Sequence, residues 1–332
     1  MTFTKSGRTL ASLAIVLSTS IITPAFAAEV KIAMNGTDDP VTNAEAAFVH
    51  GFADALKGTG FKAVVFPSDT LGSEKERFDA TAQGLVEIDL ATVSTGVGMS
   101  PLLKGVLLPF LFKDSDEFDA VIAKSDLLAE MNKPLLENGI HLAGFNYIGV
   151  GIGIHNSQHA VTKMSDLKGL RLRALNPEQL EYEQALGANG TIIAWSEVAN
   201  AIQVGIADGY LNPPNSSLRT GHTAFLKHFT PANISPSTRA VFVSNDWYET
   251  LSADEKAEID KALEAGMTAN RAWLADWSTK VMARMKEAGV TISQLEPGER
   301  EKMVAATAKT WPSIMAADDL QKYLDALNIV RN

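Results

Sequence analysis

The chain of 332 residues contains no cysteine. This absence excludes disulfide bonds, thiolate metal sites and cysteine nucleophiles. Long apolar runs are also missing, because the apolar stretch at residues 10–22 has about 13 residues and a bilayer core needs about 20. Basic residues are in the minority, with 29 Lys and Arg against 39 Asp and Glu. This balance makes nucleic acid and anionic lipid unsuitable partners.

The N-terminus has the pattern of a secretory signal peptide. Lys5 and Arg8 precede the apolar stretch, and Ala25-Phe26-Ala27 fits the small-x-small cleavage rule. Removal of residues 1–27 takes two basic residues and no acidic ones, so the formal net charge goes from −10 to −12. We therefore expect a periplasmic protein without direct membrane insertion. An anionic ligand would need a local cationic anchor.

Short β-rich runs alternate with capped helices along the remaining chain, which predicts an α/β protein. Capping boxes are expected at Ser73-Glu76 and Ser252-Glu255. The second box opens a helical pattern of more than about 30 residues, which suggests a strut that crosses two lobes. The last substantial helix is expected between Pro297 and Pro312.

Searches for catalytic motifs find no G-x-S-x-G turn, no P-loop and no H-E-x-x-H pair. The sequence therefore predicts no catalytic residue, no metal site and no cofactor. A periplasmic enzyme would need a convergent acid–base pair such as Asp208 with Glu197. For these two acids we favour structural roles at a turn and a helix start.

One short run carries a candidate anion anchor. Leu170 to Ala174 alternates like a strand, with Leu172 on one face and Arg171 and Arg173 on the other. Arginine suits a carboxylate because it offers two parallel N–H donors and stays charged when desolvated. From alternation alone, two surface arginines are the default interpretation.

The order of several motifs resembles the solute-binding proteins of tripartite ATP-independent periplasmic (TRAP) transporters, of the C4-dicarboxylate-binding type. The resemblance covers nearly the whole mature chain and rests on these segments: Phe66-Pro67 with Leu71-Gly72, Leu108-Pro109-Phe110-Leu111-Phe112, Asp166-Leu167-Lys168-Gly169 with Arg173, and Gly205-Ile206-Ala207-Asp208-Gly209 with Asn212. It implies a two-lobed clamp with mixed sheets, discontinuous lobes and a bridging helix. We expect residues 28–150 plus about 238–267 in the first lobe, and residues 151–237 plus about 268–332 in the second.

The resemblance also implies a ligand site. Arg173 matches the carboxylate-binding arginine of the family. Asn212 matches a position whose residue commonly hydrogen-bonds the ligand, and Glu197 matches a position where the family has a Glu. The predicted strand ends of the first lobe add polar residues that close on the ligand: Asn35, Thr37, Thr92, Ser94 and Thr95. Four aromatic residues near these segments are further candidates: Phe145, Tyr147, Trp195 and Tyr210.

Two departures from the family pattern bear on the ligand. Ile152 stands where many members have a second arginine, and Leu211 stands where a Glu is frequent. A second carboxylate would then lack its partner, so we expect a small monocarboxylate, delivered to an integral-membrane TRAP permease. The alternatives are a binding subunit of another importer or of a sensor.

Overall fold

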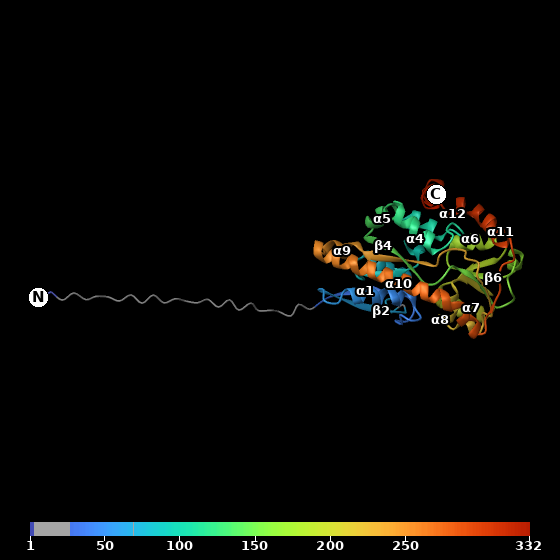
Figure 1. Cartoon of the computed structure of the whole chain (residues 1–332), viewed down its shortest axis with the longest axis horizontal. Helices are drawn as coiled ribbons and strands as arrows, with labels where there is room; N and C mark the ends of the chain where they lie inside the picture. The colour runs from blue at the N-terminus through green and yellow to red at the C-terminus, as the bar shows by residue number, and fades with distance from the viewer. Residues whose placement is uncertain (3–26, 69) are drawn as a thin grey trace.

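The computed structural model describes residues 1–2, 27–68 and 70–332 (Figure 1). The predicted n-region, the apolar stretch and most of the predicted cleavage site lie outside the described residues. Within the described ranges, no helix has the length and apolar character needed to cross a membrane.

The first sheet has five strands in the order β2-β1-β3-β10-β4. Their bounds are β1 Ala28–Ala33, β2 Phe61–Phe66, β3 Ile88–Ala91, β4 Ile140–Tyr147 and β10 Thr238–Ser244. The first three are parallel to one another, whereas β10 is antiparallel to both β3 and β4. A strand from late in the chain is thus inserted into an otherwise N-terminal sheet, which confirms the predicted mixed and discontinuous architecture.

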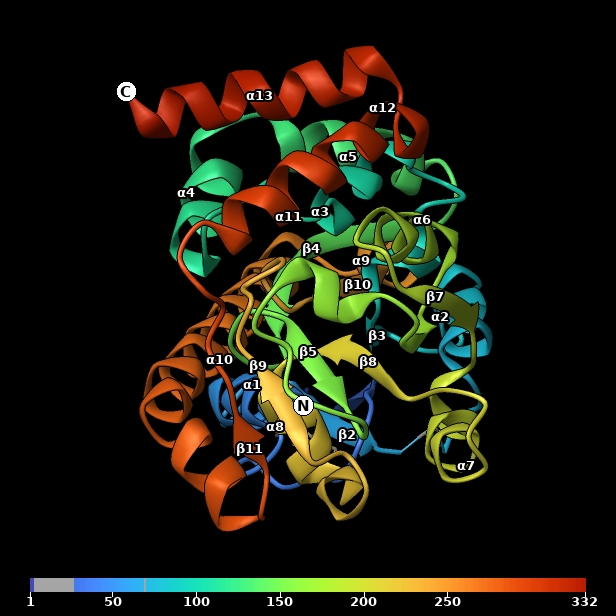
Figure 2. The same cartoon turned by 90° about the vertical axis from the view of Figure 1, so that its right-hand side faces the viewer.

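The second sheet has six strands in the order β11-β9-β5-β8-β6-β7 and faces the viewer in Figure 2. Their bounds are β5 Gly153–Asn156, β6 Arg171–Ala174, β7 Asn189–Ile192, β8 Gly209–Asn212, β9 His228–Thr230 and β11 Thr291–Ile292. We call the first sheet with the helices packed on it the first lobe, and the second sheet with its helices the second lobe.

Helices cover both sheets, and α2 (Glu74–Ala82) and α10 (Ala253–Glu287) begin at the two capping boxes that the sequence predicts. Ser73 and Ser252 both form complete capping boxes, and Asn176 caps its helix through the amide of Gln179. The bounds are α1 Ala44–Ala55, α2 Glu74–Ala82, α3 Lys104–Leu107, α4 Ser115–Lys124, α5 Leu127–Leu136, α6 Pro177–Ala185, α7 Val198–Gln203, α8 Pro214–Arg219, α9 Asn245–Thr250, α11 Glu299–Thr307, α12 Trp311–Ile314 and α13 Ala317–Arg331.

One helix, α10 (Ala253–Glu287), has 35 residues and joins the lobes. In Figure 1 it runs from beside α9 towards α8. Its early residues Ile259 and Leu263 pack in the core of the first sheet, whereas Met285 packs against Phe229 of β9 in the second. The predicted strut across both lobes is confirmed.

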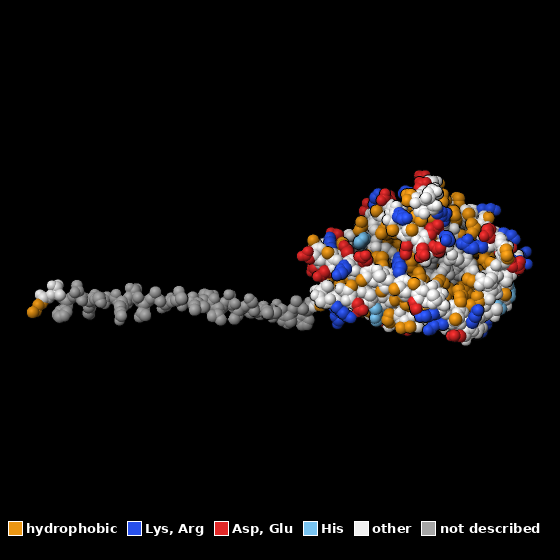
Figure 3. Space-filling view, in the orientation of Figure 1, with side chains coloured by type: hydrophobic (Ala, Val, Ile, Leu, Met, Phe, Trp, Pro, Cys, Tyr) orange, Lys and Arg blue, Asp and Glu red, His pale blue; other side chains and the backbone are white. Residues whose placement is uncertain are grey.

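Charged side chains are mixed over the surface. On the face shown in Figure 3, Lys and Arg side chains alternate with Asp and Glu. Several lie in helical pairs, for example Lys75 with Asp79 at 2.8 Å. Exposed pairs of this kind contribute only about 0–1 kcal/mol each, so we assign them to solubility.

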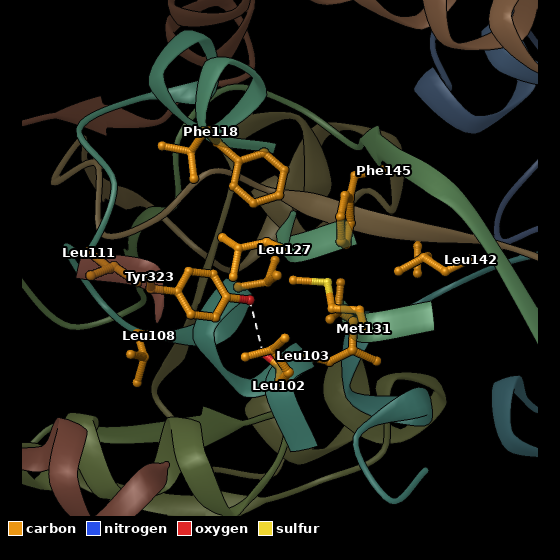
Figure 4. Packing of buried hydrophobic residues seen from close by; sticks show 14 of the residues in the cluster. Leu102, Leu103, Leu108, Leu111, Phe118, Leu127, Met131, Leu142, Phe145 and Tyr323 are labelled. Carbon is orange, nitrogen blue, oxygen red and sulfur yellow. Dashed lines mark hydrogen bonds between the residues drawn. The ribbon is translucent and has the colours of Figure 1, made fainter. Parts of the chain in front are cut away.

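The C-terminal helix α13 packs in the core of the first lobe. Tyr323 and Leu327 belong to the same buried cluster as Phe118 and Leu127 (Figure 4). The Tyr323 hydroxyl donates a hydrogen bond to the Leu102 carbonyl at 2.9 Å. Two expectations therefore need correction. The segment that ends near Pro312 is not the last substantial helix, and α13 packs with the first lobe, although Met303 of α11 packs with the second as expected. The chain crosses back because the apolar face of α13 is buried by α4 and α5.

Candidate functional site

A cavity of about 120 Å³ lies between the two lobes. Strand ends and helix starts of both lobes contribute to its wall, as expected for an α/β ligand crevice. Its polar and charged lining comprises Glu74, Thr92, Arg173, Asn176, Gln179, Asn212, Ser216, Arg219, Ser235, Ser237, Thr238 and Arg239. Its apolar lining includes Val106, Leu107, Ile148, Ile152, Leu175, Leu211, Pro213, Trp195 and Pro236.

Strand alternation positions the arginines of β6. Leu172 points into the second-lobe core and is 1% exposed. Arg171 is at the strand's exposed start, where Nη2 lies 2.6 Å from Asp208 Oδ1. Arg173, two residues further, is 3% exposed and lines the cavity. Both arginines lie on the same face of β6. Arg171, at the exposed start of the strand, has a structural role, whereas Arg173 borders the cavity.

The Arg173 guanidinium is oriented by two contacts. Nε donates to the Ile193 carbonyl at 2.8 Å, and the guanidinium carbon lies 5.5 Å from the centre of the Trp195 ring. Burial lowers the pKa of Arg173 to about 10, so the group stays charged at neutral pH. Among the described residues, no carboxylate lies within ion-pair distance of it. Its terminal nitrogens therefore remain free to bind an anion in the cavity.

Asn212 supplies a second donor. It is the last residue of β8, the strand that pairs with β6. Its Nδ2 is buried and has no hydrogen-bond partner among the described residues, although it borders the cavity. An unpaired buried amide is costly, so an acceptor in the cavity would stabilise this arrangement.

Of the predicted residues of the 92–95 turn, only Thr92 borders the cavity. The Thr95 hydroxyl donates to the Thr92 carbonyl at 2.7 Å, and the Ser94 hydroxyl lies 3.3 Å from that of Thr92. Ser94 and Thr95 thus hold the turn together. Trp195 is the one predicted aromatic residue that the cavity includes.

The predicted residues of the first strand end lie outside the cavity lining. Asn35 is buried. Its main-chain N–H donates to Glu45 Oε2 at 2.7 Å, and its side-chain oxygen accepts from Arg77 Nη2 at 2.9 Å. Thr37 is exposed, and its carbonyl accepts from Asn43. Both residues build the turn.

Three predicted aromatic residues also lie outside the lining. Phe145 packs edge-on against Phe118 with the ring centres 5.1 Å apart, and the Tyr147 hydroxyl donates to the Ser115 carbonyl at 2.9 Å. Both residues lie in the first-lobe core because the register shift in the β4–β10 pairing turns them inward. Tyr210 is fully buried, with its hydroxyl 3.2 Å from His222 Nδ1.

The acid–base pair considered for an enzyme is not assembled. Glu197 is exposed and makes no side-chain cap at the start of α7. Asp208 accepts from both the main chain and the side chain of Arg171, at 2.8 and 3.0 Å. Each acid therefore has a different environment, and neither borders the cavity.

The structure adds charged residues that the motifs did not indicate. Glu74 accepts from Arg239 and from Asn35 through the same oxygen, and Arg239 Nε lies 3.1 Å from Glu45 Oε1. Burial alone would raise the pKa of Glu74, but Arg239 and Arg77 hold it below its ordinary value. Glu74 is thus ionised at neutral pH. In the sequence it signals only a helix start, because its partners lie far along the chain.

Together, two lobes, a bridging helix and a cation-lined cavity between them define a binding protein of the clamp type. The chain belongs to the family described as bacterial extracellular solute-binding protein, family 7, whose model matches residues 33–318. This result agrees with the resemblance noted in the sequence.

Known relatives span several ligands. The chain is 26% identical to the C4-dicarboxylate-binding periplasmic protein DctP of Rhodobacter capsulatus over 90% of this chain and 88% of that protein. A TRAP solute-binding protein from Polaromonas sp. JS666, bound to D-erythronate, is 21% identical, with a TM-score of 0.82 over 90% of this chain and 98% of the other. A TRAP solute-binding protein from Shewanella oneidensis with bound succinate is 18% identical, with a TM-score of 0.82 over 90% of this chain and 99% of the other.

Proposed function

We propose that this protein captures a small organic monocarboxylate in the cavity between its lobes and delivers it to a TRAP-type membrane permease. The observation that carries the proposal is Arg173, a buried guanidinium that borders the cavity and has no carboxylate at ion-pair distance among the described residues. A ligand carboxylate would accept from its two terminal nitrogens. Asn212 Nδ2 would donate to an adjacent oxygen.

Capture would proceed by hinge closure. The wall of the cavity is divided between lobes, with Thr92 and Arg239 on the first and Arg173 and Asn212 on the second. A ligand that contacts both sides binds the closed form better than the open one. It therefore shifts the population towards closure by its differential affinity for the two forms. The closed form would be the one that the permease recognises.

The cavity favours a monocarboxylate that carries a hydroxyl group. The ionised Glu74 borders the cavity, and a carboxylate accepts hydrogen bonds without donating any. A ligand hydroxyl could donate to it, whereas a second carboxylate nearby would be repelled. The apolar wall formed by Val106, Leu107 and Ile148 suits a short carbon skeleton.

The compartment follows from the family description, which is extracellular. We further propose that residues 1–27 are a signal peptide removed on export to the periplasm. No group of three or more metal-ligating side chains occurs in the described ranges. The proposed capture uses only hydrogen bonds and charge, with no cofactor.

A thermal-shift screen tests the proposal. The mature protein is stripped of co-purified ligand by unfolding and refolding, then screened against small carboxylates, amines and sugars. A ligand at about 100 times its Kd should add roughly 2.7 kcal/mol of stability, which shifts Tm by several degrees. Shifts confined to carboxylates and abolished by Arg173→Ala support the proposal. Shifts with amines or sugars alone would refute the arginine anchor.

A further inference from the structure

Arg219 is a second cavity arginine without a partner of its own. It is the last residue of α8, which follows β8 directly, and it borders the same cavity as Arg173. Among the described residues, its side chain makes no hydrogen bond and no ion pair within 4.0 Å. Burial lowers its pKa, and the charge of Glu45 only partly offsets this effect. By its accessible surface the side chain is half-buried, so water is only partly removed from the guanidinium.

Arg219 reaches across the space between the lobes. Its helix belongs to the second lobe, but a Cβ atom placed on Gly36 of the first lobe would overlap its Nη1 atom. Gly36 lies in the turn after β1 and has φ +73°, a backbone conformation that favours glycine. The glycine thus leaves room for the guanidinium beside the first lobe.

The other cavity arginines differ from Arg219 in their contacts. Arg239 is neutralised by Glu74 and Glu45. Arg173 is fixed by the Ile193 carbonyl and has its terminal nitrogens free. Ile152 borders the cavity with an uncharged side chain. Arg219 is therefore the available source of a second cationic contact.

We infer that Arg219 binds a second oxygen acceptor of the ligand and thereby selects oxygen-substituted carboxylic acids over apolar acids of the same length. The inference rests on the proposed carboxylate capture and names the substrate class more closely. A guanidinium that faces a methylene group of a bound ligand loses hydrogen bonds to water without replacement. A hydroxyl or carbonyl oxygen replaces them with a charge-assisted bond. A hydroxyl could also donate to a cavity acceptor such as Glu74.

The test uses two pairs of open-chain acids of matched length: butanoate with D-erythronate, and hexanoate with D-gluconate. Isothermal titration calorimetry compares the wild type with Arg219→Met, which keeps an unbranched apolar stem and removes the donors. Arg284→Met is the matched control, because Arg284 stacks on Trp277 of α10 and does not border the cavity. Circular dichroism and Tm verify that each variant is folded.

The wild type should bind the oxygenated member of at least one pair more tightly. Arg219→Met should weaken that binding by roughly 10- to 100-fold and leave the apolar acid within about twofold, whereas Arg284→Met leaves both unchanged. Equal weakening of both members, no weakening of either, or failure of the wild type to bind an oxygenated member overturns the inference. The carboxylate screen with Arg173→Ala decides the proposed function separately.

A double-mutant cycle tests the position of Arg219 independently. Gly36→Ala should weaken binding of the oxygenated acid in the wild type, because the new methyl group displaces the Arg219 guanidinium. In the Arg219→Met background the same substitution should have a smaller effect on the Kd, because no guanidinium remains to be displaced. Additive effects of the two substitutions would show that Arg219 does not bind the ligand from beside Gly36, which overturns the assignment.

Discussion

Replacement of Arg173 should change ligand affinity and stability in different directions. Its two terminal nitrogens can each donate to the ligand, and a charge-assisted hydrogen bond contributes about 1.5–3 kcal/mol. Arg173→Ala also leaves the ligand carboxylate buried without its partner, so we expect a loss of about 2–5 kcal/mol in binding. Arg173→Lys keeps the charge but lacks the planar fork that the Ile193 carbonyl orients. Its affinity should be intermediate.

The ligand-free protein should respond differently. Because burial lowers the pKa of Arg173 from 12.5 to about 10, the folded state holds this charge at a cost of about 3 kcal/mol at neutral pH. Arg173→Met removes that cost and fills a similar volume, but it loses the bond to Ile193 and the stacking on Trp195. We expect its free energy of unfolding, without ligand, to be no lower than that of the wild type.

Calorimetric titration and urea unfolding measure the two quantities on the same preparations. A ligand that binds Arg173→Ala within about threefold of the wild type would refute the anchor role. A large loss of stability in ligand-free Arg173→Met would show that the residue is structural, and the lost affinity would then reflect unfolding rather than a missing contact.

Three further predictions address other parts of the chain. Leu327→Ala should lower the free energy of unfolding by about 2–5 kcal/mol in urea denaturation, because Leu327 is 2% exposed in the first-lobe core; an unchanged midpoint would argue against the docking of α13. Burial raises the pKa of Glu183 from 4.5 to about 7, so its contribution to stability is fully present below pH 4.5 and lost as the pH rises through 7. Glu183→Gln should therefore be more stable than the wild type at pH 8, with a difference that shrinks by pH 5; a difference independent of pH would contradict this reasoning. Ile152→Arg should strengthen succinate binding by at least about 10-fold, measured by calorimetry, and an unchanged Kd would show that this position does not reach the ligand.

Local signals in the sequence predicted the local structure well. Ser73 and Ser252 sit at helix starts because the hydroxyl and carboxylate of a capping box lie within four residues of each other. The length of α10 follows from an uninterrupted helical pattern. The sequence pattern does not separate α13 as an element, because Pro312 indicates a helix end. In the structure Pro312 stands in the first turn of α12, the short helix before α13.

The aromatic residues of β4 show why side-chain direction needs the structure. Phe145 and Tyr147 lie close in sequence to the cavity residue Ile148. The pairing of β10 with β4 changes register between Val241 and Phe242, which alters the alternation along β4. As a result Leu142, Phe145 and Tyr147 all pack in one core.

The candidate site was predictable only where a motif contains the residue. Arg173 follows the segment Asp166-Leu167-Lys168-Gly169, and Asn212 follows Gly209, so the family pattern indicates both. Arg219 has no such neighbour: what distinguishes it is its place beside Gly36, 183 positions earlier in the chain. Long-range contacts of this kind are set by how the two lobes meet.

The location of the cavity arginines also explains how a chain with a net charge of −10 can hold an anion. Two unit charges 4 Å apart interact by about 1 kcal/mol in water but by about 4 kcal/mol at the effective dielectric constant of a protein surface. The mixed surface charges of Figure 3 lie in water, where salt screens them beyond roughly 8 Å. Arg173 and Arg219 border the cavity between the lobes, and no carboxylate in the described ranges forms an ion pair with either. We therefore expect these two side chains, and not the total charge, to decide the sign of the bound ligand.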